Sequence, residues 1–334
     1  MIRMELGKDS YDIVLLRGGL KTAEEYFDLQ RKVMIITDTG VPLQYAEAIA
    51  NQCKQAFIKV VPEGEGSKSL QTAEEILVEM LEHQFGRKDC VVAVGGGVVG
   101  DLSGVVASLY MRGIDFYNVP TTVLSQVDSS IGGKTAVNLA GIKNIIGAFH
   151  QPKAVLVDPD TLKTLPDRQV VNGLMEALKM GVTSDETLFG IFKEGNWQNS
   201  LEEIIRRALL VKKYVVEQDE KETHLRKILN FGHTIGHGFE SVAKGNLLHG
   251  ECVALGMLYM SSENVRKELL TIYDKLGFVV PNISGMDKEE IRHAVKHDKK
   301  ANGQSCSVVY VEQIGNGTIE EWSMEHVLER LECE

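Results

Sequence analysis

Cysteine and long apolar runs are scarce in this sequence of 334 residues. It contains five cysteines, an odd number, and no two of them form a CxxC pair. This pattern excludes a disulfide framework and a cysteine zinc site, and it is typical of a reducing compartment. There is no run of about 18 apolar residues, and the first residues contain no apolar core of a signal peptide. We therefore expect a cytoplasmic protein without a membrane span.

Positive charge is also in deficit. Lys and Arg number 36 against 47 Asp and Glu, so the formal net charge is −11. Because phosphate polyanions attract clustered Lys and Arg, we expect neither a nucleic acid nor an anionic membrane as a partner. Hydrophobic residues make up 43% and charged residues 25% of the chain, which is typical of globular proteins. The length suggests about two domains.

Short apolar strands alternate with helical patterns in residues 1–155. Strands are expected at 33–37, 57–61 and 90–94, with helices near 45–55 and 70–84. This alternation predicts an α/β domain whose parallel sheet is covered by helices, with ligands beyond the carboxyl ends of the strands. Asp38 and the glycines from Gly95 onward follow such ends, where a nucleotide is expected.

Residues 156–334 have a different, mostly helical pattern. A long amphipathic helix is expected at 201–216, and apolar residues recur at helical spacing from Leu225 onward. A strand-like piece at 307–311 precedes a turn at 315–317 and a last helix near 324–331. We therefore expect a second, helical domain, with the boundary near residue 155.

Two glycine-containing segments suit anionic ligands without matching a standard motif. The GGGVVGD segment ending at Asp101 follows a strand and opens a helix, but it does not have the GxGxxG spacing. The segment ending in GGKT has Asp128 where a Walker A motif requires glycine. Its lysine, Lys134, suits a phosphate or carboxylate, as do the nearby Lys143 and Asn144. The simpler alternatives are a structural turn for the first segment and a glycine-rich loop with surface lysines for the second. A carboxylate of the polar loop at 63–68 could bind ribose hydroxyls, but on its own this loop is more simply a solvated turn.

Three histidines lie within 17 residues, flanked by glycines: His233, His237 and His249. Imidazole is the commonest zinc ligand in catalytic sites, so this grouping favours a metal site over isolated core or surface histidines. The i, i+4 spacing places His233 and His237 on one helix face, which favours them as a ligand pair. Glu176 precedes Lys179 by three residues, and that spacing alone indicates an ion pair on a helix surface.

Several longer motifs together resemble the 3-dehydroquinate synthase family over essentially the whole chain. The matching segments are ITDTGV, PEGEGSKS, VVAVGGGVVGDLSG, YMRGIDFYNVPTTVLSQVDSSIGGKTAVN, GIKNIIGAFHQP, LKTLPDRQ, LNFGHTIGHGFE, LLHGE and HDKKANG. The resemblance implies a Rossmann-like NAD-binding domain followed by a mostly α-helical metal-binding domain. It also implies a homodimer.

The resemblance further implies a lyase that depends on NAD and one divalent metal, zinc or cobalt. Such an enzyme converts 3-deoxy-D-arabino-heptulosonate 7-phosphate into 3-dehydroquinate and phosphate, a step of the shikimate route to aromatic amino acids. The C4 hydroxyl is oxidised, phosphate is eliminated, the carbonyl is reduced again, and the opened ring closes into a carbocycle.

The family motifs assign roles to residues of this sequence. The metal ligands become Glu176, His233 and His249, which replaces the pairing of His233 with His237, and His237 assists beside the metal. The NAD contacts implied are Asp38, Glu63, Gly64, Glu65, Gly66, Ser67, Lys68, Gly97, Val98, Val99, Gly100, Asp101, Thr121, Thr122, Lys134, Lys143, Thr161, Leu162, Lys163 and Thr164. Substrate phosphate is expected to meet Lys134, Asn144, Lys299 or Lys300, and Arg112 of a neighbouring subunit. The remaining substrate groups are expected to meet Asp128, Lys179, Lys212, Arg226 and Asn230.

Alternatives remain within the same fold. A cyclitol synthase such as 2-deoxy-scyllo-inosose synthase takes a substrate without a carboxylate, and a polyol dehydrogenase releases NADH and needs no phosphate cluster. The sequence also departs from the usual family pattern at Gln169, Met175, His224 and Gly238, the last standing where alanine is usual. None of these four is an expected metal ligand. Because a substrate with two anionic groups needs cations, we expect a local basic pocket in this acidic protein.

Overall fold

The computed structural model describes residues 1–283, 285–298 and 305–332. The chain forms two compact units, Met1–Pro166 and Asp167–Glu334. The first unit extends past the expected boundary near residue 155 because strand β9 (Ala154–Val157) belongs to its sheet, where it pairs with β2 and β6. Each unit is described below by itself.

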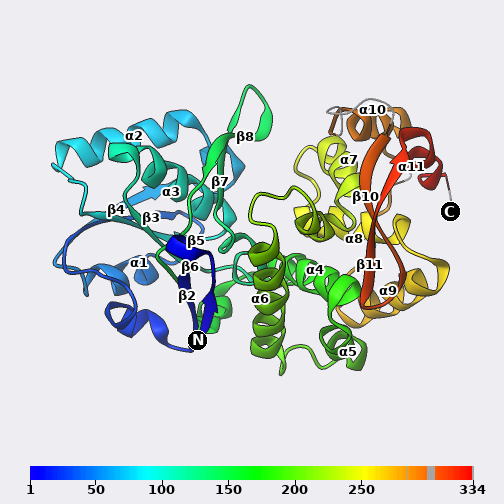
Figure 1. The fold of residues 1–334 in the computed structure, drawn as a ribbon, viewed down its shortest axis with the longest axis horizontal. Coiled ribbons are helices and arrows are strands. Elements are labelled where there is room, and N and C mark those ends of the chain that lie inside the picture. Colours follow the sequence, from blue (N-terminus) through cyan, green and yellow to red (C-terminus); the bar gives the residue numbers. More distant parts are fainter. Residues whose placement is uncertain (284, 299–304, 333–334) are drawn as a thin grey trace. The chain divides into compact units, whose positions relative to one another are not determined.

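A seven-stranded sheet organises the first unit, in the order β1-β2-β9-β6-β5-β3-β4 (Figure 1). All neighbouring strands run parallel except β1 and β2, which pair antiparallel at one edge. The predicted α/β class with a parallel sheet is therefore confirmed. Besides β9, the strands are β1 (Ile2–Met4), β2 (Tyr11–Leu15), β3 (Lys32–Asp38), β4 (Gln55–Val61), β5 (Cys90–Gly95) and β6 (Asp115–Pro120).

Side chains of each central strand point alternately to the two faces of the sheet, because the pleat has a period of two. On β3, Met34 and Ile36 join the core cluster that also holds residues of α2 (Leu70–Glu82) and α3 (Gly97–Leu109). Val33 and Ile35 join a second cluster with α1 (Leu43–Ala50) on the opposite face. Two cores on the two faces explain why these strands appear in the sequence as continuous apolar runs.

Between β6 and β9, the chain forms an antiparallel hairpin. Its strands are β7 (Lys134–Leu139) and β8 (Ile142–Phe149). The expected glycine-rich loop is limited to the residues before the hairpin, where Gly132 and Gly133 have positive φ values, and its lysines are exposed as that alternative expects. A Cβ atom on Gly147 would lie 2.0 Å from the carbonyl oxygen of Thr135, so only glycine permits the two strands to approach this closely. The glycines of this segment thus serve strand pairing as well as turns.

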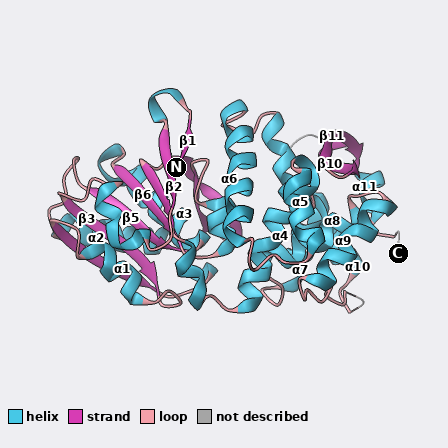
Figure 2. Cartoon of the chain, turned by 90° about the horizontal axis from the view of Figure 1, so that it is seen from below, coloured by secondary structure: helices cyan, strands magenta, loops and turns pink. Residues whose placement is uncertain are grey.

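The second unit is mostly helical, as predicted, with one hairpin of β10 (Ser305–Gln313) and β11 (Asn316–Ser323) (Figure 2). The expected strand near 307–311 and its following turn are confirmed. Cys252, Met175, Met180 and Met257 are buried in its core. The helices are α4 (Asp167–Ser184), α5 (Glu186–Glu194), α6 (Leu201–Gln218), α7 (His233–Ala243), α8 (His249–Tyr259), α9 (Glu263–Lys275), α10 (Lys288–Asp298) and α11 (Met324–Arg330).

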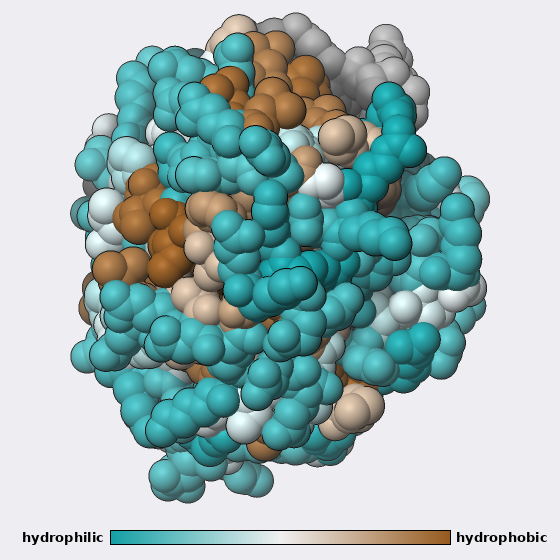
Figure 3. All heavy atoms as spheres, turned by 90° about the vertical axis from the view of Figure 1, so that its left-hand side faces the viewer, coloured by the Kyte–Doolittle hydropathy of each residue, from teal (hydrophilic) through white to brown (hydrophobic). Residues whose placement is uncertain are grey.

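Among the described residues, no helix combines the length and the apolar character that crossing a membrane requires. The face of the molecule in Figure 3 is mainly hydrophilic, with hydrophobic areas between the polar side chains. This matches the burial of most large apolar side chains in the cores of the two units.

Candidate metal centre and nucleotide site

Glu176 occupies the middle of helix α4, and its side chain is only 1% exposed. One carboxylate oxygen, Oε2, accepts a hydrogen bond from the equally buried Lys179. The other oxygen, Oε1, is buried and has no hydrogen-bond partner among the described residues. The interpretation of Glu176 and Lys179 as a surface ion pair is therefore wrong, because helix α4 is buried around almost its whole circumference.

Two imidazoles approach this unpartnered oxygen from two other helices. His233 begins α7 and His249 begins α8, and their Nε2 atoms lie 3.7 and 3.5 Å from Glu176 Oε1. The two Nδ1 atoms contact acceptors of their own, the carbonyl oxygen of Phe231 at 3.1 Å and a carboxylate oxygen of Glu240 at 2.9 Å. These Nδ1 contacts orient both rings so that their Nε2 atoms face Glu176, where deprotonated Nε2 atoms can bind a cation.

The charges around Glu176 favour its ionised form. Burial opposes ionisation, but Lys179 and the His249 side chain outweigh it and hold the pKa of Glu176 well below its usual value. Burial and the nearby Lys179 together lower the pKa of His233, so that imidazole is neutral. His249 is also buried, which lowers its pKa, but the neighbouring carboxylates of Glu176 and Glu240 outweigh burial and raise that pKa to about 10.

These three side chains fit a divalent cation. In a tetrahedral zinc site with bonds of about 2.0–2.1 Å, neighbouring ligand atoms lie roughly 3.3 Å apart, close to the separations found here. The chemistry is also suitable, since a cation would supply the missing partner of Glu176 Oε1 and accept both Nε2 lone pairs. One carboxylate and two imidazoles leave further coordination positions for a substrate.

His237 lies one turn along α7 from His233, with its ring centroid 5.3 Å from that of His233 and 6.1 Å from that of His249. It belongs to a second group of possible ligands, with Glu240 and His249, rather than to the group around Glu176. The spacing of the histidines thus located the right region but did not find Glu176, which lies far away in the sequence.

Three further cations of this unit are placed on elements that pack against each other. Lys179 on α4, Lys212 on α6 and Arg226 in the turn Leu225–Asn230 are 1%, 6% and 3% exposed. Charged side chains are rarely buried this completely unless they are paired or bind an anion. The basic pocket expected in this acidic protein stays a prediction, which the burial of these cations on packed elements supports.

Asn230 ends the same turn and donates a hydrogen bond of 2.6 Å to Glu222 Oε1. Glu222 has a positive φ of 60°, an uncommon conformation for this residue type. Sequence reasoning did not identify Glu222, because an acidic residue in a polar loop gives no pattern. Asp219 fixes the loop by accepting hydrogen bonds from the backbone N–H groups of Thr223, His224 and Arg226.

In the first unit, the expected nucleotide contacts follow the carboxyl ends of neighbouring parallel strands. Asp38 ends β3, Gly97 begins α3 just after β5, and Thr121 follows β6 directly. These strands are parallel neighbours in the sheet, so the three positions lie side by side at the carboxyl ends of the strands. Burial raises the pKa of Asp38, although the backbone N–H groups of Gly40 and Val41 oppose this effect.

The glycine-rich segment forms the start of α3, as predicted. Its N-cap residue is Gly96, and no side chain caps this end of the helix. The first N–H groups of an α-helix have no partner within the helix, and they carry partial positive charge. The N–H groups of Gly97, Val98 and Val99 therefore offer donors suited to a pyrophosphate, whereas that of Gly100 already bonds to the Gly96 carbonyl oxygen; the GxGxxG spacing is absent.

Lys68 connects three of the expected binding segments. Its ammonium group pairs with Asp101 at 2.5 Å and donates to Asn144 Oδ1 at 2.5 Å. Glu65 of the same polar loop accepts a hydrogen bond from Asn138 on β7. The solvated-turn alternative for residues 63–68 thus fails at its end, where Ser67 and Lys68 are buried, while Glu63 to Gly66 are exposed.

The remaining expected contacts differ in accessibility. Thr161 and Leu162 are buried in the turn Pro159–Thr164, whereas Lys163 and Thr164 are exposed. Lys134, Lys143 and Asn144 are exposed on the β7–β8 hairpin, Asp128 is half-buried, and Arg112 is exposed beyond α3. Lys299 and Lys300 lie outside the described residues.

Sequence comparisons decide the family. The family model for the N-terminal part of 3-dehydroquinate synthase matches residues 58–172, and the model for its C-terminal part matches residues 173–301. The chain belongs to the 3-dehydroquinate synthase family. The 3-dehydroquinate synthase of Streptococcus mutans is 40% identical over 99% of both chains, and that of Streptococcus agalactiae serotype Ia is 39% identical at the same coverage.

Solved structures of related enzymes share the fold. A 2-deoxy-scyllo-inosose synthase complexed with carbaglucose-6-phosphate, NAD⁺ and Co²⁺ is 26% identical, with a TM-score of 0.88 over 99% of this chain and 98% of the other. A 2-epi-5-epi-valiolone synthase from Streptomyces hygroscopicus with NAD⁺ and Zn²⁺ is also 26% identical, with a TM-score of 0.87 over 98% of each chain. The family and these two neighbours thus agree with the predicted two-part architecture.

Proposed function

We propose that this protein converts 3-deoxy-D-arabino-heptulosonate 7-phosphate into 3-dehydroquinate and phosphate, with NAD and one divalent metal ion. The proposal rests above all on the convergence of Glu176 Oε1 with the Nε2 atoms of His233 and His249 in a buried position. Family membership and the 40% identity to a relative named 3-dehydroquinate synthase support it.

Glu176, His233 and His249 are the residues that would hold zinc or cobalt. When bound, such an ion acidifies the substrate's C4 hydroxyl and polarises the ketone formed from it. Lys179 keeps Glu176 ionised, and the bond from His249 Nδ1 to Glu240 orients that imidazole. The two similar enzymes that hold Co²⁺ or Zn²⁺ support this choice of ions. We assign His237 to assist proton movement, which its ring centroid 5.3 Å from that of His233 supports.

We propose that NAD binds at the carboxyl ends of β3, β5 and β6 in the first unit's sheet. NAD bound there would supply the redox chemistry, since it can accept a hydride from C4 and return it within the same turnover. Asp38 and the polar loop from Glu63 supply acceptors for ribose hydroxyls, and the start of α3 at Gly97 supplies N–H donors for the pyrophosphate. The remaining contacts are proposed at Thr121, Thr122, Lys134, Lys143 and the turn Pro159–Thr164.

The substrate has a carboxylate and a phosphate, and removing both from water requires positive charge. We assign Lys179, Lys212 and Arg226 to the carboxylate and hydroxyl groups, together with Asn230 and Asp128. Lys134, Asn144 and one of Lys299 or Lys300 are assigned to the phosphate. This division favours the quinate-forming reaction over a cyclitol synthase, whose substrate has no carboxylate.

We further propose a homodimer in which Arg112 completes the phosphate site of the neighbouring subunit. Met111 and Arg112 both have positive φ values, 51° and 70°. Such strained backbone clusters where a protein has a functional constraint. Leu109 and Met111 are 54% and 43% exposed, apolar surface that a second subunit would cover.

Free thiols at the four described cysteines fit a cytoplasmic enzyme.

A phosphate-release assay tests the proposed reaction. The protein, loaded with zinc or cobalt, is mixed with the heptulosonate phosphate and NAD, and both inorganic phosphate and NADH absorbance are followed. We expect stoichiometric phosphate release without net NADH. Net NADH accumulation would indicate a dehydrogenase, and phosphate release only from a sugar phosphate without a carboxylate would indicate a cyclitol synthase.

The variant His249→Ala tests the metal centre in the same assay. We expect turnover to fall by at least 100-fold and the bound metal, measured by elemental analysis, to be lost. His326→Ala is the matched control, because this exposed histidine of the same unit lies at the start of α11, away from the three converging side chains. Full activity of His249→Ala with metal retained would refute the assignment of His249.

A further inference from the structure

Gln126 is a buried residue to which neither the family motifs nor the proposed chemistry assigns a role. It lies in the π-helical turn Ser125–Ser129 and has no exposed surface. Its Nε2 atom donates toward three acceptors: the carbonyl oxygens of Pro120 and Asp158, at 3.1 and 3.0 Å, and the hydroxyl oxygen of Thr161, at 3.1 Å. One amide group therefore contacts two segments that are distant in the sequence.

Both segments belong to the proposed NAD site. Pro120 is the last residue of β6 and directly precedes Thr121 and Thr122, while Thr161 lies in the turn Pro159–Thr164 that follows β9. Strands β6 and β9 are neighbours in the sheet, but they pair over only two residue pairs, Tyr117–Ala154 and Asn118–Val155. Strand pairing therefore ends before either segment begins, and Gln126 continues the connection beyond it.

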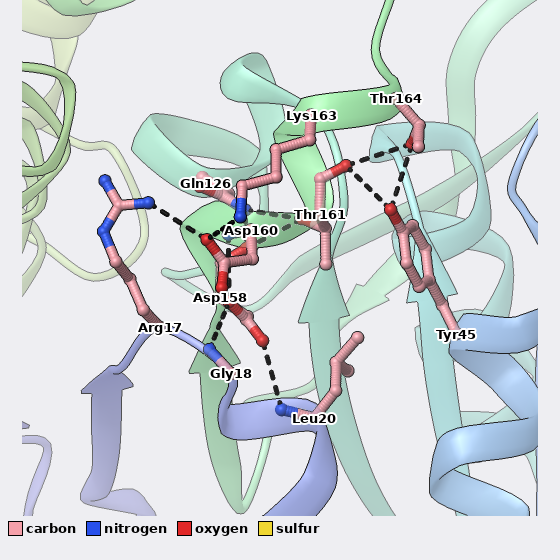
Figure 4. A network of polar contacts seen from close by, with 10 residues as sticks. All are labelled: Arg17, Gly18, Leu20, Tyr45, Gln126, Asp158, Asp160, Thr161, Lys163 and Thr164. Atoms are coloured by element: carbon pink, nitrogen blue, oxygen red, sulfur yellow. Dashed lines mark hydrogen bonds and ion pairs between the residues drawn. The ribbon is translucent and has the colours of Figure 1, made fainter.

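The turn Pro159–Thr164 is held from its other sides as well (Figure 4). The Asp158 carboxylate accepts hydrogen bonds from the backbone N–H groups of Gly18 and Leu20, at 3.0 and 3.2 Å. On the far side of Thr161, the Tyr45 hydroxyl lies 3.1 Å from Thr164 Oγ1. These contacts fix the turn to the elements around β2 and α1, whereas Gln126 alone among the residues of Figure 4 connects it to the end of β6.

The acceptors around position 126 require a side chain that donates N–H groups. Two of the three acceptors are carbonyl oxygens, so a carboxylate in this place would face them with negative charge instead of N–H groups. Gln126 Oε1 is buried without a partner among the described residues, which is a cost to folding. An apolar side chain of similar size would avoid that cost but would leave the two segments unconnected.

We propose that Gln126 is a positioning residue that sets the spacing between Thr121–Thr122 and the turn Pro159–Thr164, and thereby preorganises the NAD site. The Thr161 hydroxyl cannot donate to a cofactor, because its one proton is donated to the carbonyl oxygen of Asp158 while its oxygen accepts from Gln126. Its role is to hold the turn, so that backbone groups and the neighbouring residues meet the dinucleotide. This inference rests on the proposed function.

The test compares NAD binding to full-length Gln126→Leu and Gln126→Glu by isothermal titration calorimetry, well below their melting temperatures. We expect the Kd for NAD⁺ to rise at least tenfold in both, and more for Gln126→Glu, with Co²⁺ affinity unchanged. Hydrogen exchange of a peptide spanning 159–165 should be faster in Gln126→Leu without NAD. Gln52→Leu is the matched control, because Gln52 donates to the carbonyl oxygens of Leu20 and Ala48 and bonds directly to neither Thr121–Thr122 nor the turn Pro159–Thr164.

A general structural role would lower the melting temperature of both Gln126→Leu and Gln52→Leu without raising the Kd for NAD⁺ of either folded variant. That result, or an equal rise in both, overturns the inference. If Gln126→Glu does not fold, Gln126→Leu alone decides. Wild-type protein that binds no NAD⁺ would instead refute the proposed function, so the two failures are distinguishable.

Discussion

At the scale of single residues, His249 connects two carboxylates with the two nitrogens of one ring. Nε2 lies 3.5 Å from Glu176, and Nδ1 lies 2.9 Å from Glu240. Glu240 therefore determines which nitrogen is free to bind a cation. Carboxylate partners of this kind also raise the basicity of the ligating imidazole.

We expect Glu240→Gln to weaken Co²⁺ binding about tenfold and Glu240→Ala about 100-fold, since the first keeps an acceptor without its charge and the second removes it. Competition with a chelator of known affinity measures both values. Glu203→Gln, on the surface of α6, should leave the affinity unchanged. A Glu240→Ala variant that binds Co²⁺ as tightly as wild type would show that His249 needs no such partner.

The sequence predicted the histidines of this site better than its carboxylate. Three histidines close together are an unusual pattern, and they do meet in the structure. Glu176 was interpretable from its neighbours only as a surface residue, because helical periodicity does not show that α4 is covered on all sides. Only the family motifs indicated its role.

At the scale of elements, the packing of α7 against α10 depends on Gly238, where the family usually has alanine. A Cβ atom at this position would lie 2.6 Å from Val295 Cγ2 and 3.4 Å from the carbonyl oxygen of Ile291. Alanine would favour the helix by about 1 kcal/mol. Overpacking typically costs about 1–3 kcal/mol, so the unfavourable contact decides the sign.

We therefore expect Gly238→Ala to lower the free energy of unfolding by about 1 kcal/mol, as measured by urea denaturation. In Val295→Ala, which provides the missing space, the same change should be neutral or stabilising. The double-mutant cycle reports this coupling directly. Equal effects of Gly238→Ala in the two backgrounds would show that Val295 is not the obstacle.

Element prediction from the sequence succeeded where the apolar pattern was continuous. The buried strands β3 and β5 and the long helix α6 lie where expected, with small differences at their ends. The β7–β8 hairpin was missed because its glycines interrupt any period of two. Its pairing also depends on the close approach of Gly147 on β8 to Thr135 on β7. Such contacts between strands are not visible in either strand alone.

At the scale of the whole molecule, the proposed dimer predicts that two inactive variants restore each other. Arg112→Ala and Lys134→Ala should each release phosphate poorly. After unfolding and refolding a 1:1 mixture, random pairing would regenerate about a quarter of the sites, because half of the dimers are mixed and each mixed dimer has one intact site. Phosphate release measures the recovery, and the separately refolded variants are the controls. No recovery in a mixture that is dimeric by light scattering would exclude a shared site.

Strand β9 has a consequence for how the chain emerges from the ribosome. It is the last strand of its sheet to be synthesised, yet it lies between β2 and β6. Until Val157 has left the exit tunnel, β2 has no parallel neighbour and one edge of β6 is open. The nascent first unit therefore exposes the open edge of β2 until its last strand emerges, and that of β6 as well once β6 has been made, a period in which chaperones would have the most to protect.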